Sequence, residues 1–521
     1  MYSSRPRALV ALFSVGSVLL CMACRNDEDR TVSISDAAPA DGTVADSSST
    51  DGTANASDAV DGTSSAMADA IGDSGEGDAS LNVDAIDAGS VSLITDSGAP
   101  IGPFAFGQNY WDWVDWSNTG VTGMTGTEAE VKSLHLSVLR AGGDNNDSNS
   151  PSTFDTAQID KFVAYCRAVG AEPILQVPIV SNGADGGLAT AQTAADMVTY
   201  ANGTKGYGVK YWEIGNEPDL YSTVLGTTFP IQTAADYCTY FHNFATAMRT
   251  ANATVTDGGV AIQILGPELS WKYLPPTNDW LTPFLQGCKE DVDIVTIHRY
   301  PFSGTQVTVN GALTDATSFR RAIQSVSAIV TANARPGTPL GVTEANISYD
   351  YDPTKYSDAA QLAEPGTFYA AMWTADALGV ALETNLWTLA FWNLAEADTS
   401  GSILGFVNGG QPVPAYYAQE MISANFQGNV LAPTGVPANF SVYAAHDSAG
   451  GSTSALVVNK TSRRSSVNLT IDGNSPTTVV VSPLSLTLVQ IPDAPDGGPL
   501  VTEYTMDLAD AGLSPRQVPQ Q

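Results

Sequence analysis

Eight short apolar segments recur between residues 104 and 394, and most are followed by a stretch with apolar residues at helical spacing. Segments of this kind are typical of buried β-strands. They are Phe104–Asn109, Ser137–Gly142, Pro173–Val177, Val209–Gly215, Ile262–Pro267, Ile294–His298, Leu340–Thr343 and Asn385–Trp392. Strands that alternate with helices form a parallel sheet, and eight such units over roughly 290 residues fit a (β/α)8 TIM barrel. The sequence therefore predicts the α/β class.

Polar residues follow the fourth of these segments. Tyr211–Tyr221 reads Tyr-Trp-Glu-Ile-Gly-Asn-Glu-Pro-Asp-Leu-Tyr, so Asn216 and Glu217 stand where an apolar strand ends. The carboxyl ends of the strands form the catalytic face of a (β/α)8 barrel. A carboxyl group packed against apolar neighbours has a raised pKa, which suits a general acid. A structural glutamate in a strand-end turn would give the same short pattern.

A second carboxylate follows the seventh segment, where Leu340–Thr343 runs directly into Glu344. Strands four and seven end at the same face of the barrel, so Glu217 and Glu344 are expected there together. Retaining glycosidases need two carboxylates about 5–5.5 Å apart, one as acid/base and one as nucleophile. The two motifs together favour a glycosidase over a structural role for either residue.

These motifs resemble those of a known enzyme clan. Asn216-Glu217-Pro218 after a hydrophobic strand resembles the acid/base motif of the clan A retaining glycoside hydrolases. Thr343-Glu344-Ala345-Asn346 is similar to the nucleophile segment of the β-xylosidase/α-L-iduronidase, α-L-arabinofuranosidase and heparanase-like families. The resemblance implies hydrolysis of O-glycosidic bonds in a polysaccharide or oligosaccharide by retaining double displacement. Glu217 would be the acid/base and Glu344 the nucleophile.

Further strand ends resemble substrate-site positions of that clan. Strand six ends with His298 and Tyr300, which alternation aims to the same side, toward the sugar and toward Glu344. A Tyr300 hydroxyl donated to Glu344 would favour the ionised carboxylate. Arg140, which closes strand two, would hold Glu344 charged through an ion pair. The alternatives are a buried histidine at a capped strand end and a structural ion pair.

Two more residues are expected at the substrate. Trp392 on strand eight is a candidate floor for a sugar ring, because aromatic faces pack against apolar C–H groups. Packing in the barrel core is the competing interpretation. Asn216 would hydrogen-bond the sugar 2-hydroxyl. Strand three ends in Gln176 and carries no histidine, which argues against the cellulase-like branch of the clan.

Other carboxylates compete for the catalytic roles. Glu213 lies within strand four and is expected to fill a layer of the barrel. Glu268 ends strand five and Glu396 follows strand eight, so each is an alternative nucleophile.

The first 24 residues predict export. Arg5 and Arg7 precede the apolar run Ala8–Leu20, which is too short for a confident membrane span and is typical of a signal peptide. Ala23-Cys24 resembles a bacterial lipobox, although Cys21 stands where leucine is usual. Lipidation at Cys24 would give a cell-surface or periplasmic lipoprotein, whose only contact with a membrane is the lipid anchor. Ordinary secretion is the alternative.

Residues 25–90 are expected to form a disordered acidic linker of Asp, Ser, Ala and Gly, because they carry few bulky apolar groups. An Asp-Gly-Thr phrase recurs there at Asp41, Asp51 and Asp61. Sixteen of the 55 acidic residues lie between 25 and 100, so much of the net charge of −33 belongs to the linker. The acidic balance excludes nucleic acid as a partner.

The barrel is assigned to residues 91–425 and a small antiparallel β-sandwich to 426–492, with 493–521 as a tail of uncertain order. The sandwich rests on alternating runs separated by turn residues. The runs are Phe440–Ala445, Ser454–Asn459, Ser466–Asp472, Thr478–Ser482 and Leu484–Ile491. The segment Val91–Thr95 could supply a missing strand. Clan members of the branches named above carry a similar carboxyl-terminal sandwich.

Three cysteines, Cys166, Cys238 and Cys288, fall in the folded part, so at least one is a free thiol. A bridge between Cys238 and Cys288, on neighbouring helices, is one pairing left open. The sequence contains no metal-ligand cluster, phosphate loop or dinucleotide motif, so we expect no metal and no cofactor.

Two functions are alternatives to a glycosidase: a non-catalytic, surface-tethered polysaccharide-binding lipoprotein, and an adhesin built on the linker and sandwich. Catalytically inactive relatives usually lose a carboxylate, whereas this chain keeps both. Xylosides, arabinofuranosides, glucuronides and β-glucans all fit as substrates, with either endo or exo action.

Overall fold

The computed structural model describes residues 85–110, 124, 126–143, 147, 156–180, 188–255, 259–271, 279–302, 307–349, 366–396, 404–494 and 497–519. The predicted signal peptide, Cys24 and nearly all of the predicted linker lie outside the described residues. Within those residues, no helix combines the length and the apolar character needed to cross a membrane.

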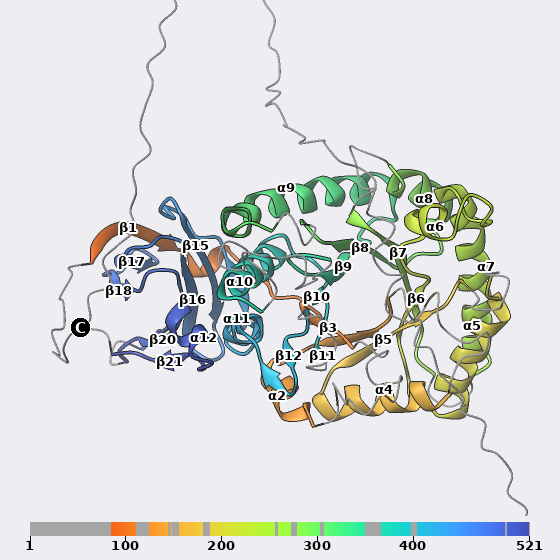
Figure 1. Cartoon of the computed structure of the whole chain (residues 1–521), viewed down its shortest axis with the longest axis horizontal. Coiled ribbons are helices and arrows are strands. Elements are labelled where there is room, and N and C mark those ends of the chain that lie inside the picture. The colour runs from red at the N-terminus through yellow and green to blue at the C-terminus, as the bar shows by residue number, and fades with distance from the viewer. Residues whose placement is uncertain are drawn as a thin grey trace, which may run out of the picture. The chain divides into compact units, whose positions relative to one another are not determined.

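Eight parallel strands close into a barrel in the order β10-β3-β4-β5-β6-β7-β8-β9 (Figure 1). The strands are β3 (Phe106–Asn109), β4 (Val138–Ala141), β5 (Glu172–Val177), β6 (Tyr211–Ile214), β7 (Gln263–Leu269), β8 (Ile294–Arg299), β9 (Leu340–Ala345) and β10 (Leu389–Phe391). Each overlaps one of the eight apolar segments of the sequence. The predicted (β/α)8 barrel is confirmed.

Helices cover the outside of the barrel. They are α2 (Glu128–Ser133), α4 (Thr156–Val169), α5 (Ala191–Val198), α6 (Tyr221–Val224), α7 (Ala234–Ala253), α8 (Leu281–Cys288), α9 (Val309–Asn333), α10 (Phe368–Glu383) and α11 (Pro414–Ser423). Short turns of other helix types span Thr95–Ser97, Thr199–Thr204 and Pro218–Leu220.

Threonine caps help to set where these helices begin. Four of these barrel helices begin after a threonine that accepts a hydrogen bond from a backbone N–H three residues later, namely Thr190, Thr233, Thr308 and Thr367. Each such cap stabilises a helix by about 1 kcal/mol. A disulfide between Cys238 and Cys288, whose Cα atoms lie 5.7 Å apart, joins α7 to α8. Cys166 in α4 is a buried free thiol.

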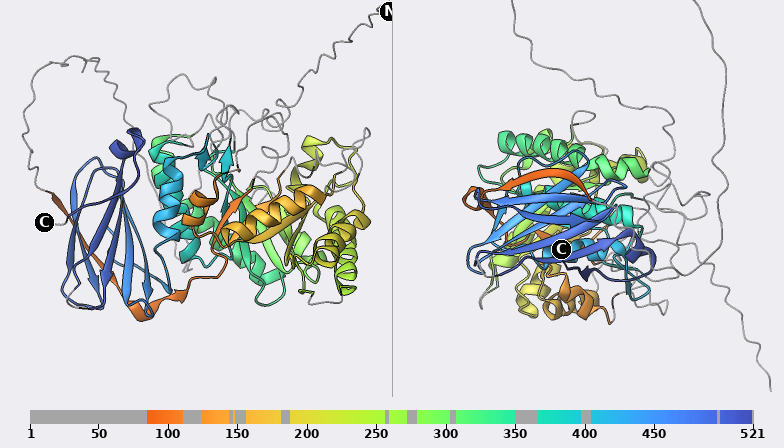
Figure 2. Two further views of the ribbon diagram at one scale, coloured as in Figure 1. Left: turned by 90° about the horizontal axis from the view of Figure 1, so that it is seen from below. Right: turned by 90° about the vertical axis from the view of Figure 1, so that its left-hand side faces the viewer.

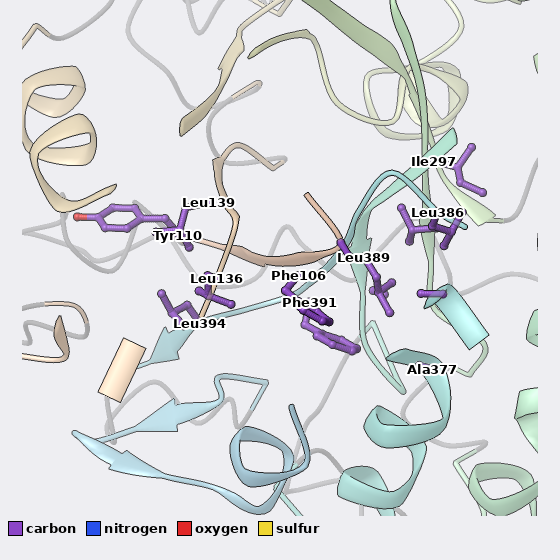
Figure 3. Close-up of a cluster of buried hydrophobic side chains, with 14 of the residues drawn as sticks. Phe106, Tyr110, Leu136, Leu139, Ile297, Ala377, Leu386, Leu389, Phe391 and Leu394 are labelled. Carbon is purple, nitrogen blue, oxygen red and sulfur yellow. The ribbon is translucent and has the colours of Figure 1, made fainter. Parts of the chain in front are cut away.

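The inside of the barrel changes from apolar to polar along the strands. Five strands each give one side chain to an apolar layer: Val138, Ile174, Tyr211, Leu265 and Ile294. Alternation returns the side chain two positions further on to the same inner face. Four such residues, all buried, are Arg140, Gln176, Glu213 and Thr296. The intervening positions belong to the larger core, part of which Figure 3 shows with Leu139 of β4 and Leu389 of β10.

The carboxyl-terminal strands form two sheets around a second core. The seven-stranded sheet contains β2 (Ala99–Pro100), β14 (Asn429–Leu431), β15 (Phe440–Asp447), β16 (Ser452–Asn459), β19 (Ser485–Pro492), β20 (Leu500–Thr505) and β21 (Arg516–Gln517). The other contains β1 (Ile86–Leu93), β17 (Ser465–Ile471) and β18 (Thr477–Val481). A small sheet after β10 contains β11 (Ala395–Glu396), β12 (Val407–Asn408) and β13 (Gln411–Pro412).

Two segments differ from the expected boundaries. The first strand β1 starts at Ile86, within the stretch expected to be linker, and pairs in parallel with β17; its orange ribbon lies among the blue strands in Figure 2. Residues 493–521 are not simply a tail, because β20 pairs with β19 and leads into α12 (Met506–Asp510). Val501 and Tyr504 of β20 are buried, and this apolar burial gives the segment its order.

Helix α10 contacts the sandwich through polar groups. Tyr443 of β15 donates its hydroxyl hydrogen to Asp376 at 3.0 Å, and Lys460 pairs with the same carboxylate at 2.6 Å. A Cβ atom at Gly379 would lie 2.3 Å from the Tyr443 ring, so only glycine allows this close approach. Helix α10 also packs against α9 and α11, and it is buried along nearly its whole length.

Candidate active site

The two glutamates singled out in the sequence meet at the carboxyl end of the barrel. Glu217 follows β6, and Glu344 is the fifth residue of β9. His298 of β8 is the register partner of Glu344. One ligand atom from each of Glu217, His298 and Glu344 lies within 4.8 Å of the other two. The folding of the barrel therefore brings together residues that are up to 127 positions apart.

The turn after β6 aims Glu217. Gly215 and Glu217 both have positive φ angles, of 73° and 44°, which bend the chain sharply at the strand end. The Glu217 N–H donates to the backbone carbonyl of Glu268 at 3.0 Å. Asp219 accepts hydrogen bonds from the N–H and hydroxyl of Ser270, at 3.0 and 2.6 Å. These bonds fasten the turn to the end of β7.

Glu344 is held by two donors. Arg140 Nη1 lies 2.7 Å from its Oε1, and the Tyr300 hydroxyl donates to its Oε2 at 2.8 Å. Both contacts are those expected from the sequence. The two oxygens of Glu344 therefore each have a donor from a different strand end, which fixes the orientation of the side chain.

Arg140 connects several strands. Its Nε donates to Glu213 at 2.5 Å, while Nη1 and Nη2 donate to Asn109 at 3.0 Å and to Asn216 at 2.9 Å. The planar guanidinium can serve these acceptors together because its N–H groups point in fixed, divergent directions. Arg140 is fully buried. It therefore positions Glu344 and Asn216, and it is too buried to contact a ligand itself.

His298 lies between carboxylates. Its Nδ1 is 2.9 Å from Oε1 of Glu217 and 3.6 Å from Oε2 of Glu344, and its Nε2 is 3.0 Å from Oε2 of Glu268. Its side chain is fully buried. The resemblance led us to expect His298 to face the sugar, whereas both ring nitrogens contact carboxylates. This geometry suits the positioning of Glu217 better than a sugar contact.

The buried charges balance within this cluster. Burial alone would raise the pKa of Glu268, but the hydrogen bond from His298 and the charge of Arg140 lower it to about 2. Burial raises the pKa of Glu213 to about 8, against the opposing charge of Arg140. Burial alone would lower the pKa of His298, but the charge of Glu344 and the hydrogen bonds to Glu217 and Glu268 raise it well above its usual value. Arg140 and a protonated His298 thus face the Glu268 carboxylate, whose low pKa favours its ionised form.

Solvent exposure separates the four carboxylates. The side chains of Glu213 and Glu268 are 0% exposed, whereas those of Glu217 and Glu344 are 14% and 8% exposed. Glu396, the remaining candidate, is 1% exposed and accepts a hydrogen bond from Asn393 at 3.0 Å. Among these five, only Glu217 and Glu344 have a side chain with appreciable access to a ligand.

Trp392, the residue after β10, reaches the same place. A Cβ atom at Gly143 would lie 2.6 Å from the Trp392 indole and 3.7 Å from Oε1 of Glu344. The indole, the Gly143 backbone and the Glu344 carboxylate are therefore neighbours. Gly143 has a φ of +105°, so glycine is favoured there for its backbone conformation as well.

Glu217, His298 and Glu344 offer enough ligand atoms to hold a metal ion. The donor set fits one poorly, because a metal needs a neutral imidazole with a lone pair directed at it. Here both His298 nitrogens face carboxylates, and the raised pKa favours a protonated ring. The charge of Arg140, 2.7 Å from Glu344, would also repel a cation.

Supporting residues were missed in the sequence. Asp147 is buried and accepts hydrogen bonds from the Asn216 N–H at 3.1 Å and the Ile179 N–H at 2.6 Å, and it also contacts the Tyr221 hydroxyl. Asn109 donates to the carbonyl of Thr343, next to Glu344, at 2.9 Å. Nothing in the Asp-Asn-Asn-Asp stretch that ends at Asp147 distinguishes it from an ordinary polar loop.

Solved glycoside hydrolases share this fold. An α-L-arabinofuranosidase from Thermotoga maritima, in complex with arabinose, aligns with a TM-score of 0.54 and 16% identity over 77% of this chain and 97% of its own. A family 51 α-L-arabinofuranosidase from Bifidobacterium longum aligns with a TM-score of 0.56 and 17% identity, over 74% of this chain and 88% of its own. A family 39 β-xylosidase from Caulobacter crescentus aligns with a TM-score of 0.50 and 16% identity, over 73% of this chain and 83% of its own.

These likenesses confirm, at the level of the fold, the resemblance to clan A glycoside hydrolases. No protein-family model matches the sequence, and no curated protein does.

Proposed function

We propose that this protein is a retaining glycoside hydrolase with Glu217 as acid/base and Glu344 as nucleophile. The observation that carries the proposal is the pair of accessible carboxylates, whose nearest ligand oxygens lie within 4.8 Å. Retaining enzymes place their two carboxyl groups about 5–5.5 Å apart, whereas inverting enzymes leave about 6.5–9.5 Å for a water molecule. The short separation favours retention.

The contacts of each carboxylate suit its role. Arg140 and Tyr300 hold Glu344 as the anion that a nucleophile requires. Its oxygen attacks the anomeric carbon while the bond to the leaving oxygen breaks, and Glu217 gives that oxygen its proton. Glu217 then takes a proton from water, whose oxygen displaces Glu344 from the anomeric carbon.

Substrate contacts follow from the same geometry. Arg140 fixes Oδ1 of Asn216, which turns the amide nitrogen away from Arg140 and toward a sugar 2-hydroxyl. Trp392 supplies the apolar floor beside Glu344. The neighbours named above are arabinofuranosidases and a xylosidase, so pentosides of plant polysaccharides are the first substrates to try, followed by glucuronides and β-glucans.

A panel of aryl glycosides covering these sugars tests the proposal. We expect hydrolysis of at least one substrate, and loss of that activity in Glu344→Ala. Glu172→Ala, which changes an exposed glutamate at the start of β5, is the matched control and should keep wild-type activity. A polysaccharide that binds without hydrolysis would favour the non-catalytic alternative, for which the paired carboxylates give no support.

We further propose that the enzyme is exported and anchored through acylated Cys24, with the acidic residues 25–84 as the spacer. The proposal rests on the Ala23-Cys24 junction and the composition that follows it. Mass spectrometry of the mature amino terminus should find a diacyl or triacyl Cys24. An unmodified residue at a different position would instead indicate ordinary secretion.

A further inference from the structure

Glu268 is a buried carboxylate that the double displacement does not use. Its side chain is 0% exposed, so it touches no substrate. Oε2 accepts a hydrogen bond from the Thr343 hydroxyl at 2.6 Å and lies 3.0 Å from His298 Nε2, and Thr296 donates to Oε1. A carboxylate that accepts from three donors is an ionised one, because a protonated acid would have to donate at one of these places.

The ionised Glu268 determines the proton on one side of His298. A hydrogen bond between Nε2 and a carboxylate requires the N–H on Nε2. Nδ1 then faces two further carboxylate groups, Glu217 at 2.9 Å and Glu344 at 3.6 Å. A neutral ring would direct its Nδ1 lone pair at these carboxylates, whereas an imidazolium would donate to Glu217 and place its positive charge 3.6 Å from Glu344. The three surrounding carboxyl groups therefore favour a second proton.

We infer that Glu268 is a positioning residue that keeps His298 doubly protonated, so that one imidazolium serves Glu217 and Glu344 in turn. The inference rests on the proposed function. Before the sugar reacts, the imidazolium balances the Glu344 carboxylate. Once Glu344 has become an ester and lost its charge, the same imidazolium lies 2.9 Å from Glu217 and stabilises the carboxylate needed as base in the second step.

Every charged group that faces His298 enters this balance. Glu217 and Glu213 come from β6 and its turn, Glu268 from β7 and Glu344 from β9. Arg140 of β4 lies 3.6 Å from Oε2 of Glu268 and adds positive charge on that side. Burial and the Glu268 carboxylate raise the pKa of Glu213, so Glu213 contributes little charge. The raised pKa of His298 agrees with the inference.

Nitrogen-15 NMR of histidine-labelled wild-type protein tests the inference without a substrate. The chain has four histidines, and the signal of His298 is the one that disappears in His298→Asn. We expect both nitrogens of His298 to carry a proton from pH 5 to pH 8. A neutral His298 at pH 7 would overturn the inference.

Glu268→Gln tests the cause. The amide keeps the shape of the side chain and removes its charge, so the pKa of His298 should fall by about 1–3 units. Glu217 then loses the imidazolium that stabilises its carboxylate, and the basic limb of the kcat/KM profile should move to higher pH. Glu172→Gln is the matched control and should leave both the His298 titration and the profile unchanged.

The direction in which the basic limb of the kcat/KM profile moves in Glu268→Gln decides between the inference and a simple loss of charge. If His298 stayed charged in Glu268→Gln, the loss of a negative charge near Glu217 would move the limb to lower pH, and the inference would be wrong. An unshifted His298 titration would also contradict it. If no glycoside is hydrolysed, the proposed function fails while the NMR titration still reports on Glu268 and His298.

Discussion

Arg140 of β4 and Glu344 of β9 form an ion pair of 2.7 Å across the mouth of the barrel. Their strands are not neighbours, since β3 and β10 lie between them in the closed sheet. The same guanidinium also contacts Glu213 of β6 at 2.5 Å. One buried side chain thus joins the nucleophile candidate to the opposite wall of the barrel, and its loss should affect both stability and activity.

Arg140→Ala should lower the free energy of unfolding by about 3–5 kcal/mol, because Glu344 would lose its cation in the interior and Glu213 would lose its hydrogen-bond donor. Urea unfolding followed by tryptophan fluorescence measures the change. Arg167→Ala is the control: its pair with Glu172 is 43% and 42% exposed, so it should cost less than about 1 kcal/mol. An equal loss of unfolding free energy in the two variants would show that the buried ion pair stabilises the fold no more than the exposed one.

Tyr300→Phe removes the hydroxyl that donates to Glu344 and keeps the ring. A hydrogen bond to a charged group contributes about 1.5–3 kcal/mol, so kcat/KM should fall by about 10- to 150-fold. Steady-state kinetics on the best aryl glycoside measures this change. Tyr207→Phe, which removes a surface hydroxyl bound to Asp160, should retain wild-type kinetics. A kcat/KM equal to that of the wild type in Tyr300→Phe would show that the Tyr300 hydroxyl has no role in catalysis.

Gly143→Ala should displace Trp392. The new Cβ would lie 2.6 Å from the indole, and misplacement of a substrate-positioning group by about 1 Å can cost 100-fold in rate. Gly170→Ala is the matched control, because Gly170 also has a positive φ, of 85°, but has open space around it. Both variants should lose about 1–2 kcal/mol of stability from backbone strain. Only Gly143→Ala should lose kcat/KM; a loss in both would point to strain alone.

The low pKa of Glu268 predicts how stability depends on pH. Its pKa is about 2 in the folded protein, below the value of 4.5 expected for the unfolded chain. The ionised group therefore contributes stability fully above pH 4.5 and loses that contribution as the pH falls toward 2. The difference in unfolding free energy between wild type and Glu268→Gln should shrink by about 3 kcal/mol as the pH falls from 6 toward 2. A constant difference down to pH 3 would contradict this account.

The barrel could be predicted from the sequence because buried parallel strands are apolar on both faces and stand out as short runs. The apolar layer of Val138, Ile174 and Tyr211 lies two positions before Arg140, Gln176 and Glu213, so strand alternation alone places the polar layer. The pairing of Glu344 with Arg140 and Tyr300 followed from the strand ends and the family resemblance.

Other contacts could not be predicted, because they depend on the register between strands that are far apart in the sequence. Glu268 reads only as one more carboxylate at a strand end, and nothing local indicates its contact with His298. Asp147 supports Asn216 from a position 69 residues away in the sequence. The strand β20 was missed because Leu500–Thr505 shows its alternating pattern over too few residues to stand out from a polar tail.

The two glutamate variants should behave differently if the proposed roles are right. Glu344→Ala should abolish turnover of every substrate, because no glycosyl ester can form. Glu217→Ala should still react with an aryl glycoside whose leaving group needs no proton, and should be slow in the second step. Added azide should then restore turnover and give a glycosyl azide of unchanged anomeric configuration. Azide rescue of Glu344→Ala that gives a glycosyl azide of unchanged anomeric configuration would instead reverse the two roles, whereas an inverted azide from that variant agrees with Glu344 as nucleophile.

The stereochemistry of the first-formed product tests the central claim most directly. Proton NMR during the first minutes of hydrolysis by the wild-type enzyme, before mutarotation, identifies the anomer that is released. The short separation of Glu217 and Glu344 predicts the same anomeric configuration as in the substrate. Release of the inverted anomer would contradict the retaining mechanism and both catalytic assignments.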